Sequence, residues 1–131
     1  MARTIETRTE TITLGEDGIL RCRVKPVDNH SLEDAIANVR ASAELLAGAR
    51  APTLLDARSA RAITRPAREY YTGPENAKVT LGTAMLINSS VGRIIGNFMI
   101  QVNRPAFPIP LFSDEAEALR WLAELRDGAK R

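Results

Sequence analysis

The feature of this sequence that most constrains its fold is an alternation of strand patterns and helix patterns along most of its length. The strand patterns are short apolar or alternating runs, and the helix patterns repeat apolar residues every three or four positions. Two strands come first, and helices and strands then alternate, in the order ββαβαβαβα. Alternation of this kind favours right-handed crossovers and parallel strands. The sequence therefore predicts an α/β fold with a mixed, mostly parallel sheet of about five strands and four helices.

The two initial strands are predicted to form a hairpin around residues 15–18, a turn-forming Gly-Glu-Asp-Gly cluster. A Thr-rich segment, 4–14, precedes the turn, and an alternating segment, 19–25, follows it. The first segment is polar on both faces over most of its length, which is typical of an edge strand. We expect Glu6 and Glu10 on this strand to face the basic residues of the second strand and to cancel much of their charge.

The later elements are bounded by capping and turn residues. Ser, Thr and Asn precede the helix patterns, where they are favoured as caps, and Gly ends the first two helices. The predicted helices cover 31–48, 64–72, 90–102 and 113–126, and the predicted strands cover 52–56, 79–87 and 107–112.

The helix predicted over 90–102 carries the strongest apolar stripe in the chain. Six of its residues fall within about a third of the helical circumference. The residues expected to face the core are Val91, Ile94, Ile95, Phe98, Met99 and Val102. Polar residues on the other side, Arg93 among them, exclude a membrane span for this segment.

Composition limits the chemistry that the chain can perform. Its 131 residues fit one domain, 1–131, and the net charge of +2 gives no general nucleic-acid signature. One Cys and one His provide neither a disulfide, nor a metal-ligand set, nor a Ser-His-Asp or Cys-His site. We expect Cys22 to be a core residue and His30 a turn residue. With no secretion signal pattern at its start, we expect a cytoplasmic protein that needs no metal or cofactor and has no enzymatic activity.

The segment TLLD at 53–56, the ending PLFSDEAEALRWL at 110–122 and the order of elements resemble SpoIIAA-like or STAS domains. The resemblance includes the small stand-alone bacterial members, some of which are described as STAS/SEC14-like. The resemblance implies a SpoIIAA-like fold and a non-catalytic domain that docks on protein partners or binds small ligands. In the anti-sigma antagonists of this family, a Ser or Thr at the start of the helix after the third strand is phosphorylated. The matching stretch here is Thr64-Arg65-Pro66, so the acceptor serine is missing and the resemblance does not imply that switch.

An arginine-rich loop follows the strand predicted at 52–56 and leads into the next helix. Arginine binds phosphate and carboxylate groups through paired hydrogen bonds, and α/β folds collect anions at the carboxyl ends of parallel strands. The candidate residues for an anionic ligand or an acidic partner are Arg58, Arg61, Thr64, Arg65 and Arg68. The alternative is a solvated surface in a chain that uses Arg fifteen times and Lys three times.

A second candidate anion site is the turn before the helix predicted at 90–102. It contains Asn88, Ser89 and Ser90, with Arg93 one turn further along. Free N–H groups at a helix start can hold an anion, although the same residues serve as ordinary caps. If the strands are parallel, this turn and the arginine-rich loop lie at the same end of the sheet.

A third candidate is an interface on the same helix. Gly92, Gly96 and Ile100 follow each other at four-residue spacing, on a side distinct from the apolar stripe. Small residues allow another backbone to approach, which suits either a partner subunit or close packing within the chain.

Three functions are consistent with these observations. The first, which we favour, is a cytoplasmic, non-catalytic regulatory or protein-interaction module that forms a homodimer. The alternative is a domain that binds a small anionic or lipid-like molecule between the two loops. The third is an enzyme that uses the same two loops. None of the three involves nucleic acid.

Overall fold

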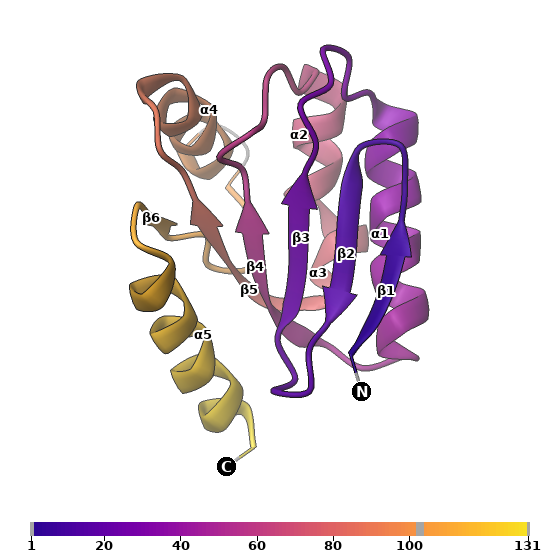
Figure 1. Cartoon of the computed structure of the whole chain (residues 1–131), viewed down its shortest axis with the longest axis vertical. Coiled ribbons are helices and arrows are strands. Elements are labelled where there is room, and N and C mark those ends of the chain that lie inside the picture. The colour runs from indigo at the N-terminus through magenta and orange to yellow at the C-terminus, as the bar shows by residue number, and fades with distance from the viewer. Residues whose placement is uncertain (1, 102–103, 131) are drawn as a thin grey trace.

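The centre of the fold is a six-stranded sheet whose strands lie side by side in chain order (Figure 1). The computed structural model describes residues 2–101 and 104–130, without the side chains of residues 91, 95, 98 and 99. The first three strands are antiparallel, and the later strands are parallel. The strands are β1 (Arg3–Glu6), β2 (Glu10–Leu14), β3 (Leu20–Val24), β4 (Ala51–Asp56), β5 (Thr80–Leu86) and β6 (Leu111–Phe112). The mixed, mostly parallel sheet predicted from the alternation is confirmed, with one strand more than expected.

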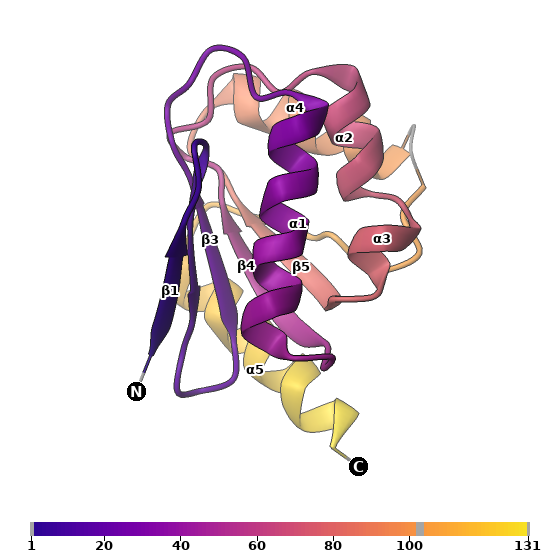
Figure 2. The same cartoon turned by 90° about the vertical axis from the view of Figure 1, so that its right-hand side faces the viewer.

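Helices cover the two faces of the sheet unequally (Figures 1 and 2). They are α1 (Leu32–Leu46), α2 (Arg65–Tyr71), the single turn α3 (Pro74–Ala77), α4 (Ser90–Gln101) and α5 (Glu115–Ala129). The connections from β3 to β4, from β4 to β5 and from β5 to β6 each lead to the next strand on the same side. Such connections are right-handed, so the helices within them, α1 to α4, all lie on one face of the sheet. Helix α5 packs on the other face, against β4 and β5. None of the helices in the described residues is long and apolar enough to cross a membrane.

The segment 4–14, predicted as one strand, folds back on itself to form β1 and β2. A tight turn joins them: the N–H of Thr7 donates to the carbonyl of Glu10 at 2.9 Å, and the Thr7 hydroxyl accepts from the N–H of Glu10 at 3.0 Å. Strand β1 is therefore the edge of the sheet, and β2 lies inside it between β1 and β3. The prediction of an edge strand from the polar character of this segment is correct for its first half, β1, but wrong for its second half, β2.

The expectation that Glu6 and Glu10 both neutralise basic residues of the neighbouring strand is half right. Glu6 pairs with Lys25 at 2.7 Å. Glu10 is opposite Val24, on the sheet face covered by α1 to α4, and only 2% of it is exposed. The turn at Thr7 shifts which face the later residues occupy, so Glu10 lies among core residues.

The core has two layers, one on each face of the sheet. On the face covered by α1, residues of β2 and β3 such as Ile12 and Leu20 pack against Val39 and Leu45 of the helix. On the other face, β4 and β5 pack against α5, where Leu122 is fully buried. The two layers together hold the strands of the central sheet in place from both sides.

Helix α4 faces the sheet with a different side from the one expected. Ile94, predicted to face the core, is 68% exposed, whereas Gly96 is buried against Leu111 and Met85. Ile100 also packs on the core, so the small-residue side of α4 faces its own chain. The absence of a side chain at Gly96 lets the helix lie close to β6. The rest of the predicted stripe, Val91, Ile95, Phe98, Met99 and Val102, lies outside the described residues or side chains.

A substitution at Gly82 tests how closely α5 packs on β5. A Cβ atom there would lie 2.7 Å from Leu125 and 3.1 Å from both Trp121 and Pro108. We expect Gly82→Ala to lower the free energy of unfolding by about 1–3 kcal/mol, because three neighbours must move at once. The matched control is Gly128→Ala, where nothing lies within 4 Å and a small gain is expected from helix propensity. Urea denaturation of both variants measures the difference, and equal stabilities would contradict close packing at Gly82.

Candidate functional site

A cavity of about 40 Å³ lies between the sheet and the helices α1 to α3. Its walls are mostly apolar, and its volume exceeds the roughly 30 Å³ that one water molecule occupies in the liquid. Polar side chains from seven elements interrupt the apolar wall. They include Glu10, Cys22, Asn38, Ser42, Thr53 and Tyr71.

Helix α1 brings polar residues to this buried wall because of their spacing. Asp34, Asn38 and Ser42 follow each other every four residues, which places them on one side of the helix. All three are buried, next to the apolar stripe formed by residues such as Ala35 and Val39. The helix therefore carries a polar stripe beside its apolar one on the face that meets the sheet.

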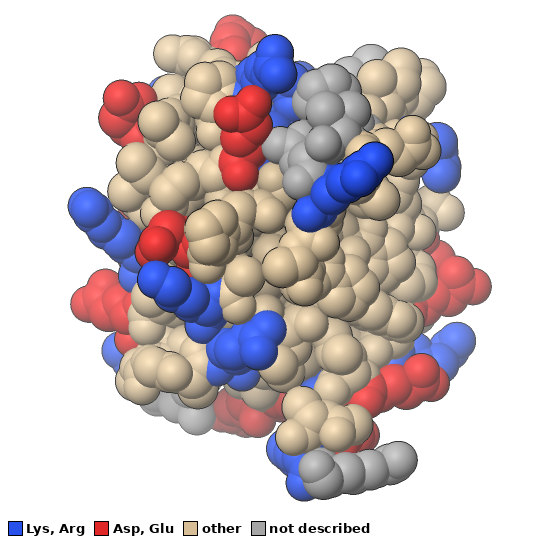
Figure 3. Space-filling model, turned by 180° about the vertical axis from the view of Figure 1, so that it is seen from behind, with Lys and Arg blue, Asp and Glu red and all other residues tan. Residues whose placement is uncertain are grey.

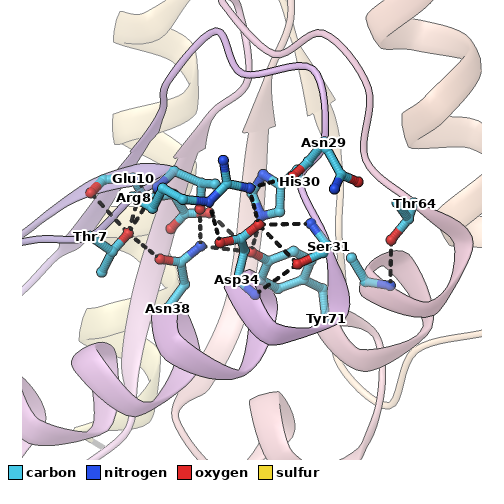
Figure 4. Close-up of polar contacts among 12 residues, drawn as sticks. Thr7, Arg8, Glu10, Asn29, His30, Ser31, Asp34, Asn38, Thr64 and Tyr71 are labelled. Carbon is cyan, nitrogen blue, oxygen red and sulfur yellow. Dashed lines mark hydrogen bonds and ion pairs between the residues drawn. The ribbon is translucent and has the colours of Figure 1, made fainter.

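The hydroxyl of Tyr71 is the meeting point of a hydrogen-bond network (Figure 4). The side-chain N–H₂ of Asn38 donates to it at 2.9 Å, and Nε2 of His30 lies 2.5 Å from it. The hydroxyl in turn donates to Oε2 of Glu10 at 3.3 Å. Nδ1 of His30 has no hydrogen-bond partner among the described residues, so we assign the ring proton to Nε2 and treat that atom as the donor to Tyr71.

Asn38 extends the network to the turn between β1 and β2. It also donates to the hydroxyl of Thr9 at 2.9 Å and accepts from the hydroxyl of Thr7 at 2.5 Å. The turn that places Glu10 in the core is thereby bound to the middle of α1.

A bidentate ion pair lies beside this network. Arg8 donates from Nε to Asp34 at 2.9 Å and from Nη2 at 2.5 Å. Asp34 also accepts from the N–H of Ser31 at 2.9 Å, which completes a capping box at the start of α1. These hydrogen bonds, chiefly those from Arg8, hold the pKa of Asp34 well below its ordinary value.

Burial keeps the titratable groups in the cavity wall, and His30 beside it, uncharged near neutral pH. Desolvation raises the pKa of Glu10 from 4.5 to about 8, against the opposing hydrogen bonds from Tyr71 and Cys22. Desolvation raises the pKa of the Cys22 thiol well above 9.0 and also raises the pKa of Tyr71. Burial lowers the pKa of His30. Cys22 is therefore a protonated core thiol, not an activated nucleophile.

His30 is not the simple turn residue that its position predicts. It is 1% exposed, and its backbone bonds to the loop before α2, with its N–H donating to Ala62 and its carbonyl accepting from Thr64. The residue thus joins the start of α1 to the start of α2.

Each predicted arginine of the loop after β4 has a partner within the chain. Arg58 pairs with Asp56 at 2.8 Å and with Glu115 at 3.2 Å. The remaining contacts are Arg61 with Asp28 at 3.0 Å, Arg65 with Glu69 at 3.0 Å, and Arg68 with the carbonyl of Ile63 at 2.5 Å. On the face of the molecule that carries α1 to α4, basic and acidic side chains are interspersed rather than gathered into one patch (Figure 3). Thr64 caps α2, accepting from the N–H of Ala67 at 3.4 Å.

The second predicted site lies at the exposed start of α4. Asn88, Ser89, Ser90 and Arg93 are all exposed, and the Ser89 hydroxyl accepts from the N–H of Gly92 at 3.1 Å. This contact is the ordinary capping role that the residues also suggest. The turn follows β5, and the arginine-rich loop follows β4. Because β4 and β5 are parallel neighbours, both segments begin at the same end of the sheet, where these strands end.

The residues of the cavity network are absent from the predicted site residues. Two signals in the sequence point to them: the spacing of Asp34, Asn38 and Ser42 inside an otherwise apolar helix face, and the alternation of Glu10 with Ile12 in a strand. Tyr71 gives no such signal, since a tyrosine at a helix end is an ordinary core residue. Within the described residues, no group of three or more His, Cys, Asp or Glu could hold a metal ion.

Comparison with known proteins supports the fold. A family model described as a domain of unknown function, DUF7793, matches residues 13–126. Among solved structures, an uncharacterized protein of the DUF3478 family from Shewanella loihica PV-4, described as having a SpoIIAA-like fold, is 15% identical. The similarity covers 93% of this chain and 92% of that one, with a TM-score of 0.56. No curated protein matches the chain. The SpoIIAA-like fold implied by residues 53–56 and 110–122 is therefore confirmed.

The raised pKa of Glu10 predicts a decline in stability with pH. Between pH 4.5 and about 8, the folded chain holds a proton on Glu10 that the unfolded chain has lost, so the free energy of unfolding falls as pH rises. The lowered pKa of His30 opposes this below pH 6.5. From pH 6.5 to 8 we therefore expect a loss of about 1.4 kcal/mol per pH unit.

Urea denaturation at several pH values measures this slope in the wild type, in Glu10→Gln and in the control Glu44→Gln. We expect Glu10→Gln to lose the slope and to exceed the wild type in stability at pH 8. Glu44 lies exposed on α1, so its substitution should leave the slope intact. A wild-type stability that stays constant from pH 6.5 to 8 would contradict a protonated Glu10.

Proposed function

The chain belongs to the DUF7793 domain family, and we propose that it is a non-catalytic binding module that holds a small molecule in the cavity beneath α1. One observation carries this proposal: Glu10, 2% exposed, lines the cavity. Its partners among the described residues are the Tyr71 hydroxyl and the Cys22 thiol, which are both uncharged. A buried carboxyl without a cation is costly in a packed core, whereas a ligand that bonds to it recovers part of that cost.

The arginine-rich loop supports the proposal of an anionic ligand less well. An anion there would have to replace carboxylates that already hold Arg58, Arg61 and Arg65. The mostly apolar wall of the cavity and its few polar groups are typical of a small-molecule site. The uncharged Cys22 argues against nucleophilic chemistry, and a free buried thiol suits a reducing cytoplasm.

A second candidate function is a protein-interaction module that forms a homodimer through α4. The supporting observation is Ile94, the one large hydrophobic residue among the described side chains that is exposed, at 68%. Gly92, Gly96 and Ile100, predicted as the interface, belong to a different side of the helix. Gly96 and Ile100 contact their own chain, so the proposed dimer contact is centred on Ile94.

Filling the cavity tests the leading proposal. Val39 lies on the cavity wall and is 7% exposed. We expect Val39→Leu to change the free energy of unfolding by less than about 1 kcal/mol, because the extra methylene enters free space. The matched control is Val79→Leu, also 7% exposed but away from the cavity, where overpacking should cost about 1–3 kcal/mol.

Binding is then measured by NMR titration of the backbone amides with methylamine, methanol and formamide. We expect at least one of these molecules to shift the resonances of Glu10, Asn38 and Tyr71 in the wild type. The shift should weaken in Val39→Leu, in which the cavity is smaller. Absence of any shift with all three molecules would contradict the proposal.

The second proposal predicts the mass of the protein in solution. Light scattering at micromolar concentration should give the mass of two chains for the wild type and of one chain for Ile94→Lys. Because Ile94 is exposed in the single chain, Ile94→Lys should still fold, as circular dichroism can check, while loss of the dimer contact should lower its melting temperature. The control is Ala37→Lys, at an exposed position of α1, which should remain a dimer. A wild type with the mass of one chain would overturn this proposal.

A further inference from the structure

Resting on the proposed cavity function, we propose that the ligand is a small primary amine, bound as an ammonium ion by the carboxylate of Glu10. The alkyl part of the amine lies along the apolar wall. This identifies a ligand class for the cavity and assigns Glu10 as the residue that recognises it.

The first argument is the charge of the cavity wall. Glu10 is the one carboxyl group that lines the cavity, and no Lys, Arg or His side chain lines it within the described part of the chain. The neighbouring cation, Arg8, is already paired with Asp34. A wall with a single potential negative charge and no positive one selects cations over anions.

The second argument is the unused hydrogen-bonding capacity of Glu10. A carboxylate can accept about four hydrogen bonds. Glu10 receives one long bond, from the Tyr71 hydroxyl at 3.3 Å, and a weak one from the Cys22 thiol. An ammonium group brings three donors, and charge-assisted bonds of this kind are about twice as strong as neutral ones.

The third argument is the rest of the cavity. The hydroxyl of Ser42 lies beside Cys22 and donates to the carbonyl of Asn38 at 3.0 Å, so its oxygen remains able to accept from a second N–H of the ammonium group. Apolar side chains such as Leu55, Phe107 and Ile109 complete the wall. A cavity of about 40 Å³ suits an ammonium group that carries one small carbon substituent, because a single water molecule already occupies roughly 30 Å³ in the liquid.

Proton balance gives the proposal a distinctive signature. At pH 7 Glu10 carries a proton, and an alkylammonium ion, like the side chain of lysine, is also protonated. When the ammonium ion binds, Glu10 ionises and releases one proton to solvent. The affinity should therefore rise about tenfold per pH unit up to about pH 8 and then level off.

Glu10 is the one group of this cluster that changes charge in the pH range to be tested. The titratable groups that face it are Cys22 from β3 and Tyr71 from α2, with His30 beyond the Tyr71 hydroxyl. The pKa values of Cys22 and Tyr71 are raised above 9.0 and 10.0, and that of His30 is lowered below 6.5. On α1, Asp34 is held ionised by Arg8.

The test is a ¹³C NMR titration of the full chain that observes the side-chain carboxyl carbon of Glu10. The probe is methylamine at pH 6.5, 7.5 and 8.5, with methanol as the neutral match and formate as the anionic match. We expect methylamine to move Glu10 to its ionised resonance at pH 6.5 and its dissociation constant to fall about tenfold from pH 6.5 to 7.5. Neither matched molecule should ionise Glu10.

Two variants control the experiment. Glu10→Gln keeps the shape of the side chain and replaces a carboxyl that is already uncharged at neutral pH, so it should fold and lose amine binding, measured from the amide resonances of Asn38 and Tyr71. Glu44→Gln changes an exposed carboxyl on α1 and should bind the amine as the wild type does.

The outcomes separate this inference from the proposed function. Binding of methanol and methylamine with equal affinity, or undiminished amine binding in Glu10→Gln, would overturn the amine assignment and leave the cavity function standing. If no probe shifts the resonances of cavity residues, both proposals fail. Ionisation of Glu10 by the amine alone supports both.

Discussion

Hydrogen bonds to the hydroxyl of Tyr71 tie together parts of the chain that lie far apart in sequence. Through this one oxygen, the end of α2 contacts Asn38 in the middle of α1, His30 before that helix and Glu10 on β2. The hydroxyl accepts two hydrogen bonds and donates one, which uses all of its hydrogen-bonding capacity. Helices α1 and α2 are therefore joined to each other and to β2 by polar contacts as well as by apolar packing.

The same network explains how a carboxyl group is tolerated in the core. Holding Glu10 ionised without a cation would cost several kcal/mol, which is a large part of the 5–15 kcal/mol that separates folded from unfolded domains. Protonation removes most of this cost near neutral pH, and the Tyr71 hydroxyl satisfies one of the oxygens. An apolar residue of similar size would avoid the cost altogether. Packing therefore does not require a carboxyl group at this position. In our proposal, its role is to ionise when a cationic ligand binds.

The arginines illustrate the opposite situation, in which charge is balanced locally. Arg58 joins Asp56 at the end of β4 to Glu115 at the start of α5, and thus links two elements on the sheet face opposite α1. Arg61 and Arg65 form exposed ion pairs, each of which contributes little to stability. A cluster of arginines in sequence is thus distributed over several separate contacts in space.

Much of the architecture is local in origin and follows from the sequence. The alternation of elements, the turn at 15–18 and the cap at Ser31 depend on residues a few positions apart, and the structure confirms them. The ending at 110–122 correctly implies the SpoIIAA-like fold. Two predictions were wrong for a common reason. The faces of Glu10 and Ile94 depend on a tight turn at Thr7 and on the close approach of Gly96 to β6, which periodicity alone does not encode.

By itself, the sequence determined the α/β class, the mostly parallel sheet and the shortage of His and Cys that argues against common catalytic sites. Only the tertiary structure decided which polar residues are buried together. Glu10 and Tyr71 are 61 positions apart, and Asn38 and Tyr71 are 33 apart. Each looks ordinary within its own element: a polar strand residue, a polar helix residue and an aromatic at a helix end. Their shared cavity exists because α1 and α2 pack on the same face of the sheet, and that packing is a property of the whole chain.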